Sequence, residues 1–167
     1  MSENPVLKML GRRLRLAVSG GGPGSFIGET HRQAARFDNC YEIVAGVLSS
    51  NPEKSIKAGL DIGLATDRAY GDVMEMLSAE AERKDGVDAV SIMTPNDSHF
   101  DFASGALSHG FDVICDKPMT NTLENAQALH DQVVESGLVF CLTHNYSGYP
   151  LVRQARAMVA DGQLGAI

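Results

Sequence analysis

Residues 14–31 read LRLAVSGGGPGSFIGETH, and this stretch decides the fold that the sequence predicts. A short apolar run is followed by five glycines, the last of which is Gly28, and an amphipathic helical pattern begins near Phe26. A strand, a glycine-rich turn and a helix N-terminus in this order form an anion site, because the first helical turn leaves backbone N–H groups unpaired and the helix dipole favours negative charge. The pattern predicts a dinucleotide-binding site.

The glycines of such a loop have separate roles: a tight turn, a close approach of the backbone to pyrophosphate, and packing of the helix against the strand. Two spacings fit the first half of the fingerprint, while Gly28 lies one or more residues beyond the usual third position. A flexible turn between a strand and a helix would give a similar run, but the place of the loop directly after the first apolar run favours nucleotide binding. We expect cofactor contacts at Gly20, Gly22, Gly24, Phe26, Ile27 and Gly28.

The length and composition are those of an ordinary globular domain with one core, with 167 residues of which 44% are hydrophobic and 21% charged. No apolar run approaches the roughly 20 residues that span a bilayer, and the first ten residues lack a secretory signal. We therefore expect a cytoplasmic protein without membrane association. The net charge of −7 argues against nucleic-acid binding, and we interpret the early basic residues as a solvated lead-in to the first strand: Lys8, Arg12, Arg13 and Arg15.

Three cysteines, Cys40, Cys115 and Cys141, are far apart, odd in number and without paired spacing. Neither disulfides nor a metal site is therefore predicted. Cys115 precedes Asp116 and Lys117, so a reactive thiolate beside a lysine is one interpretation. We favour the other, in which Cys115 is a small buried residue that ends a strand.

The rest of the chain alternates apolar strands with amphipathic helices. Strands are expected at 14–18, 41–48, 68–70, 88–93, 111–115 and 138–143, and helices at 26–37, 52–64, 72–84, 97–109, 121–136 and 149–161. The strands are near-continuous Val, Ile, Ala and Leu, which is typical of a parallel sheet covered on both faces. We predict an α/β fold with a doubly wound parallel sheet of the Rossmann type, in the order 3-2-1-4-5-6, and a ligand site at the carboxyl ends of the strands.

Helical periodicity also predicts which side chains are buried. The first helix should face the core with Ile27, His31, Ala34, Ala35 and Phe37, and the helix at 72–84 with Val73, Met76, Leu77 and Ala81. Ser50 or Asn51 is expected to cap the helix that begins at Pro52.

Two motifs follow the fourth and fifth strands: TPNDSH at 94–99 and DKPM at 116–119. They resemble the TPNxxH and EKP motifs of the Gfo/Idh/MocA oxidoreductases. GETH at 28–31 and HNY at 144–146 match further motifs of that family, in the right order. The resemblance runs from about Leu14 to the last residue, and it implies an NAD(P)-binding Rossmann domain.

The resemblance also implies which residues at the strand ends contact the cofactor: Thr94, Pro95, Asn96, His99, Asp116, Lys117 and Asn145. The residues themselves leave alternatives open. Asn96 could hydrogen-bond a ribose or cap the next helix, and His99 could be a core or capping histidine. We interpret His31 as a structural residue that packs the first helix against the sheet.

Lys117 is the predicted catalytic residue. A lysine at the end of a central strand, followed by a proline that stiffens the backbone, can hold its cation near the nicotinamide ring, where it polarises a substrate hydroxyl or takes part in proton transfer. A plain surface lysine is the alternative. Asp116 stands where the family has glutamate, and its side chain is shorter by one methylene, so a contact through that carboxylate should be altered.

The end of the second strand bears on the choice between NAD and NADP. An acidic residue there normally accepts the adenosine ribose hydroxyls of NAD, but this chain has Ser49 and Ser50. Without that carboxylate a 2′-phosphate is not repelled, and Lys54 or Arg36 could help to hold it. Both cofactors remain candidates, with a lean to NADP.

Residues 1–145 are predicted to form the dinucleotide-binding domain, and residues 146–167 the start of a connection to an α+β substrate domain that the family has and this chain lacks. By resemblance the activity is hydride transfer between a nicotinamide cofactor and a sugar, inositol or related polyol. The alternative is a non-catalytic NAD(P)-binding sensor. A methyltransferase would need an acidic residue after the second strand and a reversed last strand, and we find neither. If the substrate domain has been lost, apolar surface near the carboxyl end of the sheet and beside residues 146–151 should be exposed, which predicts a homo-oligomer or a self-associating fragment.

Overall fold

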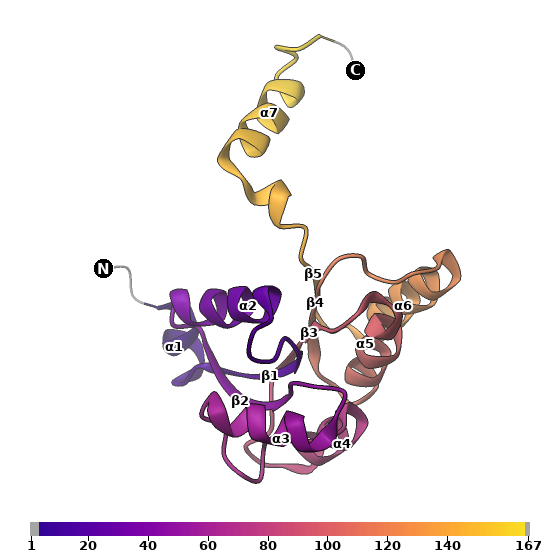
Figure 1. Cartoon of the computed structure of the whole chain (residues 1–167). Helices are drawn as coiled ribbons and strands as arrows, with labels where there is room; N and C mark the ends of the chain where they lie inside the picture. Colours follow the sequence, from indigo (N-terminus) through magenta and orange to yellow (C-terminus); the bar gives the residue numbers. More distant parts are fainter. Residues whose placement is uncertain (1–3, 166–167) are drawn as a thin grey trace.

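The computed structural model describes residues 4–165 and contains a five-stranded parallel sheet with helices on both faces (Figure 1). The strands are β1 (Leu14–Gly20), β2 (Tyr41–Val47), β3 (Ala89–Met93), β4 (Asp112–Cys115) and β5 (Phe140–Leu142). The α-helices are α1 (Pro5–Leu10), α2 (Phe26–Phe37), α3 (Pro52–Asp61), α4 (Val73–Glu82), α5 (His99–Ser108), α6 (Leu123–Ser136) and α7 (Pro150–Ala160). Two short 3-10 turns are η1 (Asn96–Ser98) and η2 (Asn145–Gly148).

The strand order is β2-β1-β3-β4-β5, and every pair is parallel. The predicted edge strand at 68–70 is reduced to one bridge, in which Ala69 pairs with Gly46 of β2. Gly46 donates to the Arg68 carbonyl at 3.1 Å and accepts from the Tyr70 amide at 3.0 Å. The doubly wound order is therefore confirmed, with the predicted third strand reduced to Ala69.

Two apolar clusters fill the space between the sheet and its helices. One joins the sheet to α4, α5 and α6, and the other joins it to α2 and α3. Strand side chains alternate between the two faces, so Ala17 belongs to the first cluster while Leu16 and Val18 belong to the second. The central strand β3 is buried along its whole length, as its near-continuous apolar sequence predicts.

Some predicted core positions are wrong. Phe37 ends α2 with 88% of its surface exposed, and Ala34 and Ala81 are exposed as well. On α4 the buried position in the last turn is Glu80, because the apolar face of the helix passes through 73, 76, 77 and 80. This carboxylate is buried because Arg68 pairs with it.

Polar side chains fix where the helices begin. In α2, α3, α4 and α6, a side-chain oxygen of the capping residue accepts a hydrogen bond from a backbone N–H of the first turn. The four capping residues are Ser25, Asn51, Asp72 and Thr122. Of the two residues expected to cap α3, the structure selects Asn51. The short helix α1 was not predicted, although Asn4 caps it and Pro5 occupies its first turn.

The basic segment before β1 is more than a solvated lead-in. Arg12 makes two hydrogen bonds to Asp88, at 2.6 and 2.9 Å, and the Arg15 amide donates to the same carboxylate at 2.7 Å. The Arg12 guanidinium holds the pKa of Asp88 below its ordinary value. These contacts fasten the start of β1 to the residue that precedes β3.

After β5 the chain leaves the sheet, and α7 stands away from the body of the molecule (Figure 1). Residues 166 and 167 of the predicted connection lie outside the described residues. No helix within residues 4–165 has the length and apolar character needed to cross a membrane.

Candidate functional site

The glycine loop lies between β1 and α2, and a side chain would not fit at two of its glycines. A Cβ added at Gly22 would lie 2.4 Å from the Leu48 carbonyl oxygen, and one at Gly28 would lie 2.0 Å from the Gly21 carbonyl oxygen. Gly28 thus brings α2 against the loop, which is the third-glycine role despite its late position in the sequence. Gly20 and Gly24 have positive φ, and Gly24 has open space around it.

The first turn of α2 leaves donors for an anion. Ser25 accepts the Gly28 amide at 3.3 Å, while the amides of Phe26 and Ile27 find no acceptor in the part of the chain that the structure describes. Arg32, one turn further along α2, donates to the Gly21 carbonyl. The loop therefore combines a glycine-rich backbone, two backbone amides without an acceptor, and a nearby cation. This set fits a pyrophosphate.

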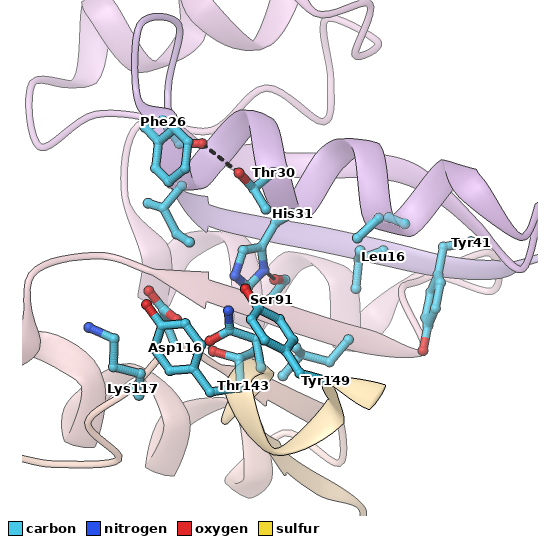
Figure 2. A pocket seen from close by; sticks show the side chains of 16 residues that line it. Leu16, Phe26, Thr30, His31, Tyr41, Ser91, Asp116, Lys117, Thr143 and Tyr149 are labelled. Carbon is cyan, nitrogen blue, oxygen red and sulfur yellow. Dashed lines mark hydrogen bonds between the residues drawn. The ribbon is translucent and has the colours of Figure 1, made fainter. Parts of the chain in front are cut away.

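A pocket of about 810 Å³ opens between the start of α2 and the ends of β4 and β5. It brings together five of the predicted site residues: Phe26, Ile27, Asp116, Lys117 and Asn145. Figure 2 shows Asp116, Lys117 and Thr143 on the side of the pocket away from α2. Segments that are about 90 residues apart in the sequence thus line the same pocket.

Asp116 is held by the neighbouring strand end. Its backbone amide donates to the Ile92 carbonyl at 2.9 Å, and Thr143 donates its hydroxyl to the Asp116 carboxylate at 2.5 Å. That Asp116 alters a contact of the family's glutamate stays a prediction. Lys117 follows as an exposed residue of the pocket wall.

His31 links α2 to the sheet, as predicted. Its Nδ1 lies 3.0 Å from the Ser91 hydroxyl of β3 (Figure 2). Burial lowers the pKa of His31, and the charge of Asp116 partly offsets that effect. His31 and Ser91 also line the pocket, so the link between helix and sheet forms part of its wall.

The TPNDSH segment does not line this pocket with the five residues above; it follows β3 along the same edge of the sheet. Pro95 and Asn96 are exposed there, and the Ser98 hydroxyl lies 2.8 Å from Thr94 Oγ1. Neither η1 nor α5 carries a side-chain cap, so the structure does not use Asn96 in the capping role.

His99 occupies the core rather than an open cleft. It is 1% exposed, and its two ring nitrogens lie 2.7 Å from the Pro118 carbonyl oxygen and 2.9 Å from the Thr94 carbonyl oxygen. These contacts and this burial favour the alternative of a core histidine, while the cofactor-side role stays a prediction.

Ser49 and Ser50 follow β2, where the ribose of a cofactor would be expected. Ser49 accepts the Asn51 amide at 3.2 Å, and Ser50 is exposed. Arg36 is in the wrong place to assist them, because it borders a hollow with Asn39 and Glu42 at the amino end of β2. The length of a seven-residue strand, about 20 Å, separates the two ends. Arg36 is thus excluded as a phosphate ligand at this position.

Cys115 ends β4 as a buried residue, in agreement with the favoured interpretation. Burial, with a smaller effect from Asp116, raises the pKa of Cys115 to about 12. The thiol is therefore unreactive at neutral pH. Within residues 4–165 no cluster of His, Cys, Asp or Glu could hold a metal ion.

A family model described as an oxidoreductase family with an NAD-binding Rossmann fold matches residues 14–144. The chain belongs to the Gfo/Idh/MocA family. In this Gfo/Idh/MocA protein the matched range covers every strand and the predicted motifs as far as His144.

Three relatives illustrate the match. The chain is 34% identical over 161 residues to the uncharacterized oxidoreductase YfiI of Bacillus subtilis, covering 96% of this chain and 41% of that protein. It is 32% identical over 124 residues to D-xylose 1-dehydrogenase (NADP(+)) 2 of Haloferax volcanii, covering 74% and 36%. The structure of an inositol dehydrogenase homolog from Azotobacter vinelandii, complexed with NADH and myo-inositol, matches with a TM-score of 0.90 and 40% identity, covering 93% and 41%. The chain thus spans about two fifths of the length of these relatives.

Several residues of the candidate site were not predicted to belong to it. Gly21 has a φ of 67° and no room for a Cβ, and its place in the glycine run was the available signal. Thr143 directly precedes the HNY motif at the end of a strand, which could have identified it. Nothing in the sequence marks Ser91 or Arg32, because their contacts depend on the packing of α2 against the sheet.

Proposed function

We propose that this chain is the nucleotide-binding part of an NAD(P)-dependent dehydrogenase that acts on a sugar, an inositol or a related polyol. The observation that carries the proposal is the shared pocket, where Phe26 and Ile27 at the start of α2 face Asp116, Lys117 and Asn145 at the strand ends. The nicotinamide cofactor, when bound, supplies the hydride chemistry. The residues of this chain supply position and charge.

Each part of the site has its own task in this proposal. The amides at the start of α2, together with Gly20, Gly22 and Gly28, hold the pyrophosphate. Thr94, Pro95 and Asn96 line the cofactor cleft after β3. Lys117 directs its ammonium group at the hydroxyl of the reacting carbon, where a cation favours the developing alkoxide and can exchange a proton with it. Asn145 lies in the same pocket and can orient that hydroxyl by hydrogen bonding.

The substrate class rests on the relatives, whose names include D-xylose 1-dehydrogenase and a homolog of inositol dehydrogenase. Both substrates are small polyhydroxylated molecules with a carbinol carbon that can lose a hydride. Lys117, Asp116 and Thr143 place charged and hydroxyl groups on the pocket wall, and such groups can hydrogen-bond the hydroxyls of a polyol.

For the cofactor we propose a preference for NADP over NAD. Ser49 and Ser50 stand where an acidic residue would reject a 2′-phosphate, and Lys54 in the first turn of α3 offers a positive charge. Fluorescence titration with NADPH and NADH measures the preference. We expect NADPH to bind more tightly, and Ser49→Asp should reverse the order by restoring the carboxylate. Tighter binding of NADH to the unmodified chain would contradict the preference.

The proposed function is tested by the same titration followed by a screen of polyols for reduction of NADP⁺ or NAD⁺. Saturable binding of either reduced cofactor is expected, and Lys117→Met should prevent any polyol-dependent reduction. Lys84→Met, which removes an exposed lysine after α4, is the matched control and should change nothing. Binding without reduction would limit the proposal to nucleotide binding. A chain that binds S-adenosylmethionine and neither cofactor would contradict it.

We further propose that the nucleotide-binding domain ends at Asn145 and that 146–167 form the connection to a substrate domain. The exposed apolar side chains of η2 and α7 support this, since Tyr146 and Leu151 are 68% and 83% exposed. The three free thiols fit a reducing compartment, which supports a cytoplasmic location.

A further inference from the structure

His99 joins two loops that no backbone ladder connects. The pairing of β3 with β4 ends at Ile92 and Cys115, and the Asp116 amide adds one last bond to the Ile92 carbonyl. Beyond this point each loop contains a proline, Pro95 in one and Pro118 in the other, and a proline has no N–H to donate. Within the described residues, no backbone hydrogen bond joins the two loops beyond this point.

The imidazole of His99 joins them from the first turn of α5. Its Nδ1 lies 2.7 Å from the Pro118 carbonyl oxygen, and its Nε2 lies 2.9 Å from the Thr94 carbonyl oxygen. Both partners are carbonyl oxygens, which can only accept, so a ring with one N–H donates to one of them at a time, and the ring as a whole lies between the two loops. The ring is 1% exposed, which removes competition from water and makes these hydrogen bonds costly to lose.

Lys117 depends on this arrangement because its side chain has no partner of its own. Within the described residues its ammonium group takes part in no ion pair or hydrogen bond, so the backbone alone decides where the side chain starts. That backbone is anchored on one side by the Asp116 amide bond to Ile92 and on the other by the Pro118 carbonyl bond to His99.

We propose that His99 is a positioning residue that sets the nicotinamide end of the site by holding the Lys117 loop against the Thr94 loop. The inference rests on the proposed function, since it assumes that Lys117 faces the nicotinamide ring. It predicts that binding of one part of the cofactor depends on His99 and that binding of the rest does not. The diphosphate and adenosine are held by the glycine loop and the end of β2, which His99 does not touch, whereas the nicotinamide end depends on it.

The experiment compares two ligands by isothermal titration calorimetry of the whole chain. One ligand is NADPH or NADH, whichever the unmodified chain binds more tightly. The other is the same molecule without its nicotinamide, which is 2′-phospho-ADP-ribose for NADPH and ADP-ribose for NADH. His99→Leu should weaken binding of the complete cofactor by about tenfold, the typical cost of losing a buried hydrogen bond, and that of the ADP-ribose by less than about twofold. His109→Leu is the matched control, because His109 lies at the other end of α5 and contacts Ser78 and Gly105. It should affect neither ligand.

Two conservative variants separate positioning from a general loss of structure. His99→Asn keeps a donor near Nδ1 and hence near the Pro118 carbonyl, while His99→Gln keeps a donor nearer Nε2 and the Thr94 carbonyl. Asn should restore more of the complete cofactor's affinity than Gln, because it holds the loop that carries Lys117. This comparison remains available if His99→Leu does not fold.

Equal weakening of both ligands in a folded His99→Leu, no weakening at all, or equal affinities for the Asn and Gln variants would overturn the inference. Failure of the unmodified chain to bind either complete cofactor would overturn the proposed function and the inference with it.

Discussion

Gly22 has no room for a side chain in the nucleotide loop. A methyl group there would meet the Leu48 carbonyl oxygen at 2.4 Å, so Gly22→Ala must push the loop away from the end of β2. We predict at least about a tenfold loss of NADPH affinity, since displaced amides lose their charge-assisted hydrogen bonds to phosphate. Fluorescence titration measures it.

Gly24→Ala is the control for that prediction. Gly24 has a φ of 85° but open space around its Cα, so the substitution should cost stability, about 1 kcal/mol for the left-handed conformation, without displacing the loop. Similar losses of affinity in the two variants would contradict a role of Gly22 in fitting the loop to its neighbours.

The pKa of His31 reports on the charge of Asp116. Burial lowers this pKa below its ordinary value of 6.5, and the Asp116 charge raises it in part. The folded chain therefore binds this proton less readily than the unfolded chain, so the contribution of His31 to stability is present above pH 6.5 and is lost as the pH falls through the folded pKa.

Asp116→Asn should lower the pKa of His31 further, because the offsetting charge is removed while the burial remains. An NMR titration of the His31 ring measures the change, and Asp101→Asn on the exposed side of α5 serves as the control. An unchanged or raised pKa in Asp116→Asn would show that the two side chains do not interact.

At the scale of elements, a buried polar cluster ties the shortened third strand to α4. Arg68 pairs with Glu80, Tyr70 donates to the same carboxylate at 2.9 Å, and burial together with this bond raises the pKa of Tyr70 to about 12. Removing Glu80 leaves the buried Arg68 with only the carboxylate and carbonyl of Asp85, at 3.4 and 3.3 Å, and leaves the Tyr70 hydroxyl without this acceptor. We predict that Glu80→Ala lowers the free energy of unfolding by about 3–5 kcal/mol.

Chemical denaturation measures this difference, and the exposed pair of Lys57 and Asp61 on α3 provides the comparison. Lys57→Ala should cost only about 0.3–0.5 kcal/mol, as for other helix-surface pairs. A loss in Glu80→Ala no larger than that of Lys57→Ala would mean that the cluster does not hold the edge of the sheet.

At the scale of the whole molecule, α7 stands away from the sheet (Figure 1), and apolar side chains of α7 and of the residue before it are exposed. Tyr149, Leu151 and Val152 are 52%, 83% and 46% exposed. We propose that the chain self-associates through this surface, so light scattering should give a mass above that of a monomer. Leu151→Glu should shift the mass towards the monomer. A monomer at all concentrations would contradict the proposal.

The layered fold could be predicted because strands buried on two faces and helices with one apolar face have distinct sequence patterns. The predictions that were wrong depended on details that a pattern does not contain. Residues 68–70 look like an edge strand, but the side chain of Arg68 is committed to Glu80 and only Ala69 bridges to β2. Phe37 lies in the helical repeat but ends its helix on the solvent side.

For the site, the rule that parallel strands end at one edge was sufficient to bring Lys117 and Asn145 to the same pocket as the start of α2. The rule does not say which way a side chain turns. His99 points into the core, and Thr143 reaches Asp116 across neighbouring strand ends. Arg36 was misplaced because sequence distance from Ser49 does not reveal that β2 runs its full length between them.

The most direct test of the account is an NMR titration of the chain with NADPH and NADH that follows every backbone amide. The account predicts that the largest shifts fall in two groups, one at Gly20–Gly28 where the diphosphate binds and one at Lys117 and Asn145 where the nicotinamide ring lies. No shift in these groups, or shifts concentrated at the amino ends of the strands around Asn39 and Asp112, would contradict it.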